Sequence, residues 1–242
     1  MDEAKRIFDG TGVQFTSEGM RHLGAAIGSQ RFKQSYLDKK IKEWIRNVEE
    51  LAKIAITEPQ VAFSAFIQRM QSRWVFVTRT VEGISELMQP LEDVIRRKFI
   101  PALLGREVND LERELFSLPA RYGGLGIGNP CVQSARQYTN SEELTTPLVA
   151  LIQGQKHTFD AKKIGKAQKK IRKSQMLQAT IGFEKSLAAI KEKAPRELKI
   201  AIEQACVKGA SSWVTARPLH SHPWTVLHKS QFRDAIYLRY SW

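Results

Sequence analysis

Cysteine is scarce in this sequence, and long apolar runs are absent from it. Only Cys131 and Cys206 occur among 242 residues, far apart and without a C-x-x-C partner. This pattern predicts two reduced, mostly buried thiols in an intracellular protein, nuclear or cytoplasmic. The N-terminal MDEAKRIFDG lacks the apolar run of a signal peptide, and no stretch approaches the roughly 20 apolar residues of a membrane span. We therefore expect no membrane partner.

The residue patterns that mark an active site are also missing. No two aspartates are adjacent, and the neighbouring carboxylates occupy positions typical of a helix face. Ser211 and Ser212 lack the G-x-S-x-G turn that exposes a nucleophilic serine. Three histidines near the C-terminus have no standard zinc spacing and no close cysteine as a fourth ligand: His220, His222 and His228. From these missing patterns we expect no catalytic residues, no metal site and no cofactor.

Glycine is concentrated in one stretch, LPARYGGLGIGNP, at positions 118–130. A Walker phosphate loop requires G-x-x-x-x-G-K-[ST], which does not occur here. A dinucleotide loop requires G-x-G-x-x-G after a buried strand, whereas the preceding DLERELFSLP is typical of a short amphipathic helix. The stretch is therefore predicted to be a structural turn built on four glycines: Gly123, Gly124, Gly126 and Gly128.

Positive charge is abundant and unevenly distributed. The chain has 38 Lys and Arg against 25 Asp and Glu, a net charge of +13. From Lys156 to Lys173, eight basic residues and the single acid Asp160 leave a local net charge of +7. Such a cluster favours a polyanionic partner, and nucleic acid over a membrane because no apolar anchor accompanies it. A solvated helix face is the alternative.

Apolar spacing predicts a mainly α fold with a short N-terminal β-hairpin. VQFT and RHLGAAI are β-prone runs separated by SEG, which indicates the hairpin. A 4-3-4-3-4 spacing from Leu37 to Ala55 predicts a long amphipathic helix. Thr57 begins a T-x-x-Q box that predicts the cap of a central helix. Further helices are expected from Pro90 and from the capping pair that starts at Asn109.

Behind the glycine turn the sequence predicts two shorter helices, at about 131–138 and 142–153, and then a basic helix over 160–178. Two more helices are expected around a break at Pro195, with a short final helix from near Ser230. On the basic helix, five lysines share a face away from Ile164 and Ile171: Lys162, Lys166, Lys169, Lys170 and Lys173. Such a face can present a stripe of cations to phosphates.

Several stretches, in order along essentially the whole chain, resemble one family. They are GMRHLGAAIGS, YLDKKIKEWIRNVEELAKIAITEPQVAFSAF, MQPLEDVIRRKFIPALLG, LPARYGGLGIGNP and KGASSWVTARPL…LHKSQFRDAIYLRYSW. Together they resemble the region behind the catalytic Tyr-x-Asp-Asp motif in the retrotransposon-encoded reverse transcriptases of invertebrate retroelements.

The resemblance implies three regions. Residues 1–30 correspond to the last palm helix and a primer-grip-like hairpin, with Leu23 and Gly24 in the family's Leu-Gly position. Residues 31–130 correspond to a helical thumb-like domain ending in the glycine-rich turn, and residues 131–242 form a basic helical C-terminal region. A palm hairpin without its sheet is expected to expose an apolar edge.

The sequence departs from the family where catalysis is concerned. The Tyr-x-Asp-Asp strand is absent, and no Asp-Asp pair replaces it. Without these carboxylates the two-magnesium site of nucleotide transfer is not formed, so magnesium is expected only in an intact parent polymerase. The family often continues into a Cys/His cluster and an endonuclease-like domain, neither of which follows Trp242. The chain is thus expected not to be an enzyme.

The expected residual function is sequence-independent binding of an RNA or DNA primer–template duplex. Thumb helices follow the backbone of a duplex, so phosphate contacts should dominate. The candidate contacts are the cations of the basic helix, followed by a second group at 96–98: Lys162, Lys163, Lys166, Lys169, Lys170, Arg172 and Lys173, then Arg96, Arg97 and Lys98.

Other interpretations stay open on the residues. In one of them, the chain is part of an intact polymerase whose gene prediction was cut short. In another, it is a pseudogene product without function. Alternatively it is a helical protein-interaction module whose partners the sequence does not name. In that module KKIGKAQKKIRK is a solvated or nuclear-import segment.

Overall fold

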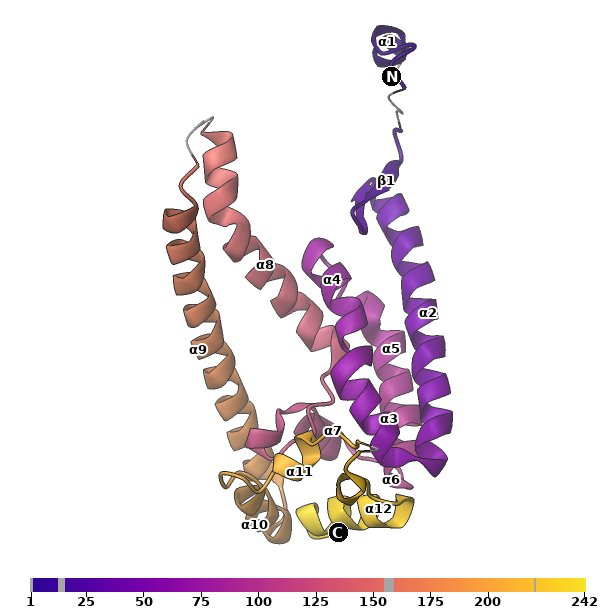
Figure 1. Ribbon diagram of the computed structural model, residues 1–242, viewed down its shortest axis with the longest axis vertical. Helices are drawn as coiled ribbons and strands as arrows, with labels where there is room; N and C mark the ends of the chain where they lie inside the picture. Colours follow the sequence, from indigo (N-terminus) through magenta and orange to yellow (C-terminus); the bar gives the residue numbers. More distant parts are fainter. Residues whose placement is uncertain (1, 13–15, 155–158, 220) are drawn as a thin grey trace.

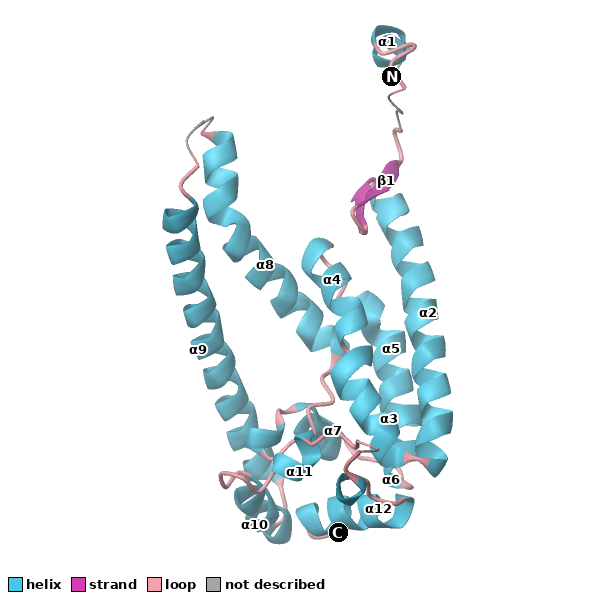
Figure 2. Ribbon diagram, in the orientation of Figure 1, coloured by secondary structure: helices cyan, strands magenta, loops and turns pink. Residues whose placement is uncertain are grey.

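The structure is a computed structural model that describes residues 2–12, 16–154, 159–219 and 221–242. As the sequence predicts, the described chain is mainly helical with one two-stranded antiparallel hairpin (Figures 1 and 2). The elements up to the glycine turn are α1 (Asp2–Ile7), β1 (Gly19–His22), β2 (Ala25–Gly28), α2 (Gln30–Thr57), α3 (Pro59–Ala65), η1 (Phe66–Met70), α4 (Ser72–Thr80), η2 (Glu86–Met88), α5 (Gln89–Val94), η3 (Ile95–Phe99), α6 (Ile100–Leu104), α7 (Asp110–Ser117) and η4 (Ala120–Tyr122).

The remaining elements form a long helical arm and a base. In Figure 1, α2 to α6 form a bundle, α8 and α9 form the arm beside it, and α7 and α10 to α12 lie below both. The C-terminal elements are α8 (Pro130–Gln153), α9 (Ala161–Lys193), α10 (Arg196–Ala205), α11 (Ser212–Thr215), η5 (Pro223–Thr225) and α12 (Lys229–Tyr240).

Helix α2 confirms the predicted amphipathic helix. Ser29 caps it by accepting a hydrogen bond from the Phe32 backbone N–H at 3.2 Å. Its buried residues follow the predicted spacing from Leu37 to Ala55, except that Ala52 is buried and Leu51 is only half-buried. This stripe packs against α3, α5 and α6, which leaves the opposite face of α2 in solvent.

The core of the bundle is aromatic. Phe66 stacks on Phe99 with ring centroids 4.5 Å apart, and Trp44 lies 6.1 Å from Trp74. Phe66 and Phe99 lie in the two π-helical turns, η1 and η3, which interrupt the long helices. Both tryptophans are almost fully buried, so neither is free to stack on a nucleobase. The segment from α3 to α4, expected to be a central helix, contributes Phe66 and Trp74 to this core.

The predicted T-x-x-Q cap at Thr57 is wrong. Thr57 ends α2, Glu58 occupies the N-cap position of α3, and no side chain caps that helix. The Gln60 side chain instead donates to the Thr225 carbonyl at 2.9 Å and accepts from the Leu227 N–H at 2.7 Å. A buried amide must form hydrogen bonds with its donor and its acceptor. The Gln60 amide finds both partners in the backbone near the C-terminus, and therefore does not cap its own helix.

The N-terminal hairpin differs in register from its prediction. Its turn is Leu23–Gly24, because His22 pairs with Ala25, whereas SEG leads into β1 and its glycine, Gly19, is the first residue of that strand. Leu23 and Gly24 have φ values of 47° and 87°, as in the two-residue turn whose twist matches that of the strands. Residues 13–15 of the predicted VQFT arm lie outside the described residues.

The helices behind the glycine turn are fewer and longer than predicted. Residues 130–153 form the single helix α8 and not two, and α9 continues past 178 to Lys193. The hydroxyls of Thr139 and Thr145 donate to carbonyls of the preceding turn, at 3.3 Å and 3.1 Å, so these polar residues do not break α8. The predicted break at Pro195 is confirmed, because this residue is the N-cap of α10.

One hydrophobic core joins the segments on both sides of residue 130. It includes Leu37 and Phe66 of the bundle and also Ile202, Phe232 and Tyr240 from the C-terminal helices. Helix α12 packs against α3 and α6, so the last residues of the chain complete the bundle. Residues 31–130 and 131–242, which the resemblance treats as two regions, therefore share one core in the described structure.

Candidate nucleic-acid interface

Helix α9 is oriented by a few contacts with α8. Asp160 caps it by accepting from the Lys163 N–H at 3.0 Å. Ile164 is buried, and the Gln168 and Gln175 side chains donate to carbonyls of α8 at 3.2 Å and 3.0 Å. Ile164, Gln168 and Gln175 share one helical face at i, i+4 and i+11. The opposite face of α9 therefore points away from α8.

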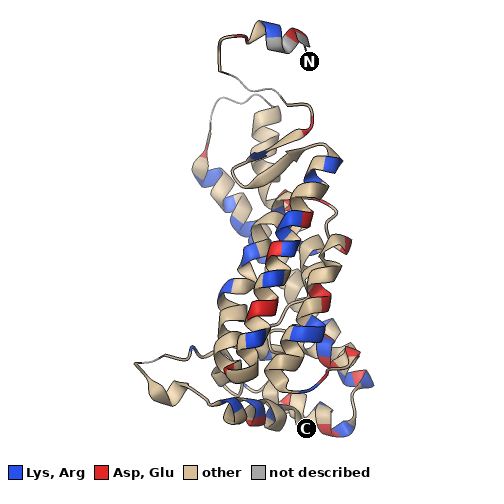
Figure 3. Ribbon diagram, turned by 90° about the vertical axis from the view of Figure 1, so that its right-hand side faces the viewer, with Lys and Arg blue, Asp and Glu red and all other residues tan. Residues whose placement is uncertain are grey.

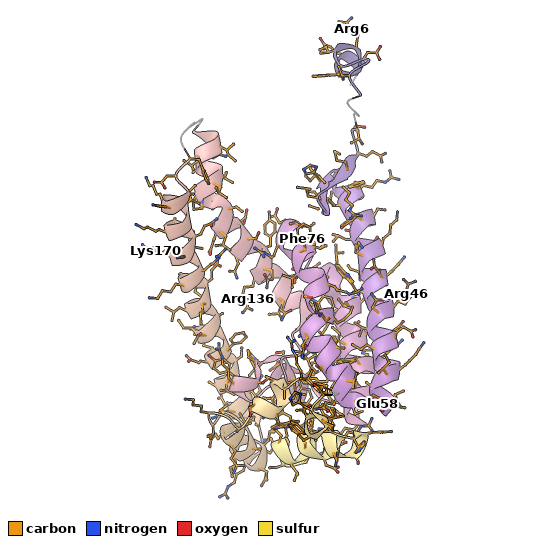
Figure 4. All side chains as sticks on the ribbon, viewed as in Figure 1. Arg6, Arg46, Glu58, Phe76, Arg136 and Lys170 are labelled. Carbon is orange, nitrogen blue, oxygen red and sulfur yellow. The ribbon has the colours of Figure 1, made fainter. Side chains whose placement is uncertain are left out.

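That opposite face carries the five lysines predicted to share a side, with Lys163 and Arg172 on its flanks, and we call the seven cations together the α9 face. All seven are exposed: Lys162, Lys163, Lys166, Lys169, Lys170, Arg172 and Lys173. Figure 4 shows Lys170 on the outer side of the arm. Within the described residues none of the seven forms an ion pair with a carboxylate within 4.0 Å. Lys156, which belongs to the same charge cluster, lies outside the described residues.

The length of the α9 face suits a nucleic-acid backbone. Lys162 and Lys173 are eleven positions apart, which is about 16 Å along an α-helix. One strand of a duplex places a phosphate about every 3.4 Å of axis, so the face spans about five phosphates of a strand. Because the charges are exposed and unpaired, their attraction for phosphates is offset within residues 156–173 only by the charge of Asp160, whose carboxylate caps the helix.

The second predicted group, at 96–98, is largely neutralised. Arg96 forms an ion pair with Asp110, and Lys98 lies 2.6 Å from a carboxylate oxygen of Glu49. Only Arg97 is exposed without such a pair within the described residues. These residues belong to η3 in the bundle, on the other side of α8 from α9 (Figure 1). The structure therefore does not join them to the α9 face.

Helix α2 carries a second set of cations that the sequence reasoning missed. Lys39, Lys42 and Arg46 are exposed, and their i, i+3, i+7 spacing places them on one face opposite the buried stripe of α2. We call them the α2 face. In the view of Figure 3, turned toward the side of α2, Lys and Arg are frequent along this part of the molecule. The signal was present in the sequence as helical spacing, but four acids in the same helix mask it in a charge count.

Leu23 and Gly24, the primer-grip-like pair, form the tip of the hairpin. Leu23 is 87% exposed, and the Gly24 carbonyl accepts from the Tyr36 hydroxyl at 2.8 Å. A Cβ on Gly24 would lie 3.2 Å from the ring of Phe76. Met20 and Ile27, which pair across the strands, are also about half exposed. The hairpin thus rests on α2 and α4 and exposes apolar side chains on its other side.

The glycine cluster is a buried turn. Gly123 and Gly126 have φ values of 81° and 73°, and a Cβ on Gly124 would lie 2.0 Å from the Leu118 carbonyl oxygen. The Gly123 carbonyl accepts from the Tyr240 hydroxyl at 2.9 Å.

Gly128 and its neighbours are equally committed to internal bonds. The Gln71 side chain donates to the Gly126 carbonyl at 3.0 Å and accepts from the Gly128 N–H at 2.8 Å. Arg113 donates to the Ile127 and Gly128 carbonyls at 2.8 Å and 3.3 Å. These groups are occupied within the fold, as a structural turn requires.

No group of three or more His, Cys, Asp or Glu side chains within the described residues is placed to hold a metal ion. Of the three C-terminal histidines, His220 lies outside the described residues. Among the helices that the structure describes, none is both long and apolar enough to span a bilayer.

Comparison with protein-family models, curated proteins and solved structures finds no match to this chain.

Proposed function

We propose that this chain binds duplex nucleic acid through the α9 face, without regard to base sequence. The observation that supports the proposal is the row of seven exposed cations without a carboxylate partner in the described structure. Lysine and arginine side chains on a helix surface reach phosphates and not base edges unless the helix enters a groove. Contacts of this kind position a duplex but do not read its sequence.

We further propose that the chain derives from the region behind the catalytic motif of a retroelement reverse transcriptase. Support for this origin comes from the sequence stretches that resemble that family in order along the chain. Because these 242 residues contain no adjacent aspartates, the proposal includes no polymerase activity for them. An in-frame Tyr-x-Asp-Asp segment in a longer transcript would instead assign the residues to an active polymerase.

The binding proposal is tested by the salt dependence of affinity. Five phosphates neutralised by the α9 face give a slope of about −4.5 in log affinity against log salt, or about a 500-fold loss between about 50 and 200 mM salt. Fluorescence anisotropy with two duplexes of unrelated sequence measures this slope. Both duplexes should give the same value. A flat response would contradict the proposal.

A five-lysine variant tests the location of the binding face. We call it the α9 variant, in which the shared-face lysines become glutamine: Lys162→Gln, Lys166→Gln, Lys169→Gln, Lys170→Gln and Lys173→Gln. Glutamine keeps helix propensity close to that of lysine, so the helix should persist. The slope should become shallower by about 0.9 for each phosphate that the variant no longer neutralises.

A matched control changes the net charge equally at other lysines that are not buried, near the base. The control variant contains Lys185→Gln, Lys193→Gln, Lys199→Gln, Lys208→Gln and Lys229→Gln. It should bind with nearly the original slope. Equal reductions in slope in the two variants would mean that net charge, and not the α9 face, attracts the duplex.

A protein-interaction role is the second candidate function. Met176 and Leu177 are 65% and 62% exposed and follow the cations directly on α9. Exposed apolar residues beside a charged stripe also suit a protein partner. Partner binding that persists at high salt would favour this function, because the attraction between cations and phosphates weakens steeply with salt.

A further inference from the structure

The α9 face and the α2 face lie on opposite sides of the molecule. Figure 4 shows Lys170 of α9 on one outer side and Arg46 of α2 on the other. Between them lie α8 and the helices α4 and α5 of the bundle (Figure 1). Each helix turns its apolar or amide side inward, toward these elements, and its cations outward.

The α2 face keeps its positive charge in the folded protein. The nearby acids have other partners: Glu43 lies 2.9 Å from the Lys40 ammonium, and Asp38 accepts from the Gln34 side chain at 3.1 Å. The hydrogen bond from Lys40, with the charges of Lys40, Arg73 and Arg46, lowers the pKa of Glu43.

The charge of Arg46, one of the remaining cations of this side, acts on Glu43 through space and not through a direct ion pair. In the part of the chain that the structure describes, Lys39, Lys42 and Arg46 form no ion pair. Arg31 is exposed two turns before Lys39 and extends the row. The face is thus a second, smaller candidate for binding phosphates.

A single short duplex cannot reach both faces. The persistence length of DNA is about 150 base pairs, so a duplex of about 15 base pairs behaves as a straight rod. A straight rod lying on the α9 face extends along one side of the molecule, whereas the α2 face points to the other side. Two short duplexes can bind at the same time, one on the α9 face and the other on the α2 face.

We propose that one molecule of this protein joins two duplexes, one on the α9 face and one on the α2 face. The inference rests on the proposed nucleic-acid binding and adds a second, independent binding surface to it. It requires no self-association, because both surfaces belong to the same chain.

The test is a capture experiment with the full chain at low salt. A duplex of about 15 base pairs is fixed to beads, protein is added below the duplex concentration, and a second, fluorescent duplex is supplied. The α2 variant contains Lys39→Gln, Lys42→Gln and Arg46→Gln. It is compared with the α9 variant, the five-lysine control and the unchanged protein. Anisotropy with a single duplex is measured for each protein in parallel.

The unchanged protein and the control variant should retain the fluorescent duplex on the beads. Each single-face variant should still bind one duplex in solution, yet its retained fluorescence should fall to that of beads without protein. Binding of one duplex without capture by the unchanged protein would overturn bridging and leave the proposed function standing.

Capture that persists in both single-face variants would also overturn the inference, because it would show that self-association joins the duplexes. Absence of any duplex binding by the unchanged protein would refute the proposed function and bridging together. Circular dichroism of the variants establishes that a loss of capture does not come from unfolding.

Discussion

Glu92 and Arg113 form a buried ion pair that joins α5 to α7 and the glycine turn. Arg113 donates from Nε and Nη2 to the two carboxylate oxygens of Glu92, both at 2.7 Å, and from Nη1 to the Ile127 carbonyl at 2.8 Å. Each of the two side chains is 6% exposed. Removing one charge therefore strands the other in the protein interior.

The expected costs follow from what each substitution leaves behind. Glu92→Leu leaves a buried guanidinium without its counter-charge, and Arg113→Met leaves a buried carboxylate, so each should lower the free energy of unfolding by about 3–5 kcal/mol. The double variant removes both charges and leaves chiefly the Ile127 and Gly128 carbonyls without a hydrogen-bond donor. It should lower the free energy of unfolding by about 1–3 kcal/mol. The double variant should thus be more stable than either single variant.

Thermal unfolding followed by circular dichroism measures these differences. For a chain of this length, 1 kcal/mol shifts Tm by about 2–4 °C, so each single variant should lose about 6–20 °C. Lys98→Gln is the matched control: its pair with Glu49 is 2.6 Å long but 58% and 34% exposed, and such pairs contribute at most about 1 kcal/mol. A double variant as destabilised as the sum of the two singles would refute the reasoning.

Two further predictions concern backbone space and thiol chemistry. Gly124→Ala should destabilise by about 1–3 kcal/mol in urea unfolding, because its Cβ meets the Leu118 carbonyl. A Cβ on Gly165, inside α9, would meet nothing within 4 Å, so Gly165→Ala should raise the free energy of unfolding by about 0.5–1 kcal/mol. Equal changes in stability for Gly124→Ala and Gly165→Ala would contradict this reasoning. Burial, with the charges of Glu92 and Asp93, raises the pKa of the Cys131 thiol to about 11. At about pH 8, only about one molecule in a thousand therefore carries the Cys131 thiolate. The rate of iodoacetamide labelling of Cys131, followed by mass spectrometry, should rise about tenfold per pH unit up to about pH 10. A labelling rate that stops rising near pH 9 would contradict the raised pKa.

Elements with strong local signals were predictable from the sequence. The spacing of Leu37 to Ala55 predicted α2, and the reciprocal bonds between Asn109 and Glu112 that cap α7 followed the expected capping pair. Pro195 ended a helix because proline lacks the N–H that a helix interior uses. Each of these signals lies within a few neighbouring residues.

Predictions failed where a distant partner or a subtle turn decided the outcome. Gln60 bonds backbone groups more than 160 positions away and not the start of its own helix. The SEG segment resembled a hairpin turn, but Leu23–Gly24 adopts the left-handed conformations that a two-residue turn needs. Two helices were expected at 131–138 and 142–153, but the residues between them continue the single helix α8.

The sequence by itself determined the helical class, the excess of positive charge and the row of lysines on one side of α9. These properties depend on composition and on a helical period, which are local. The tertiary structure alone decided which cations remain free and where they point. Lys98 is neutralised by Glu49, 49 positions earlier, and Arg96 by Asp110, whereas packing turned the cations of α2 and α9 to opposite sides. Pairing and direction depend on segments brought together by folding, because charges interact through space and not along the chain.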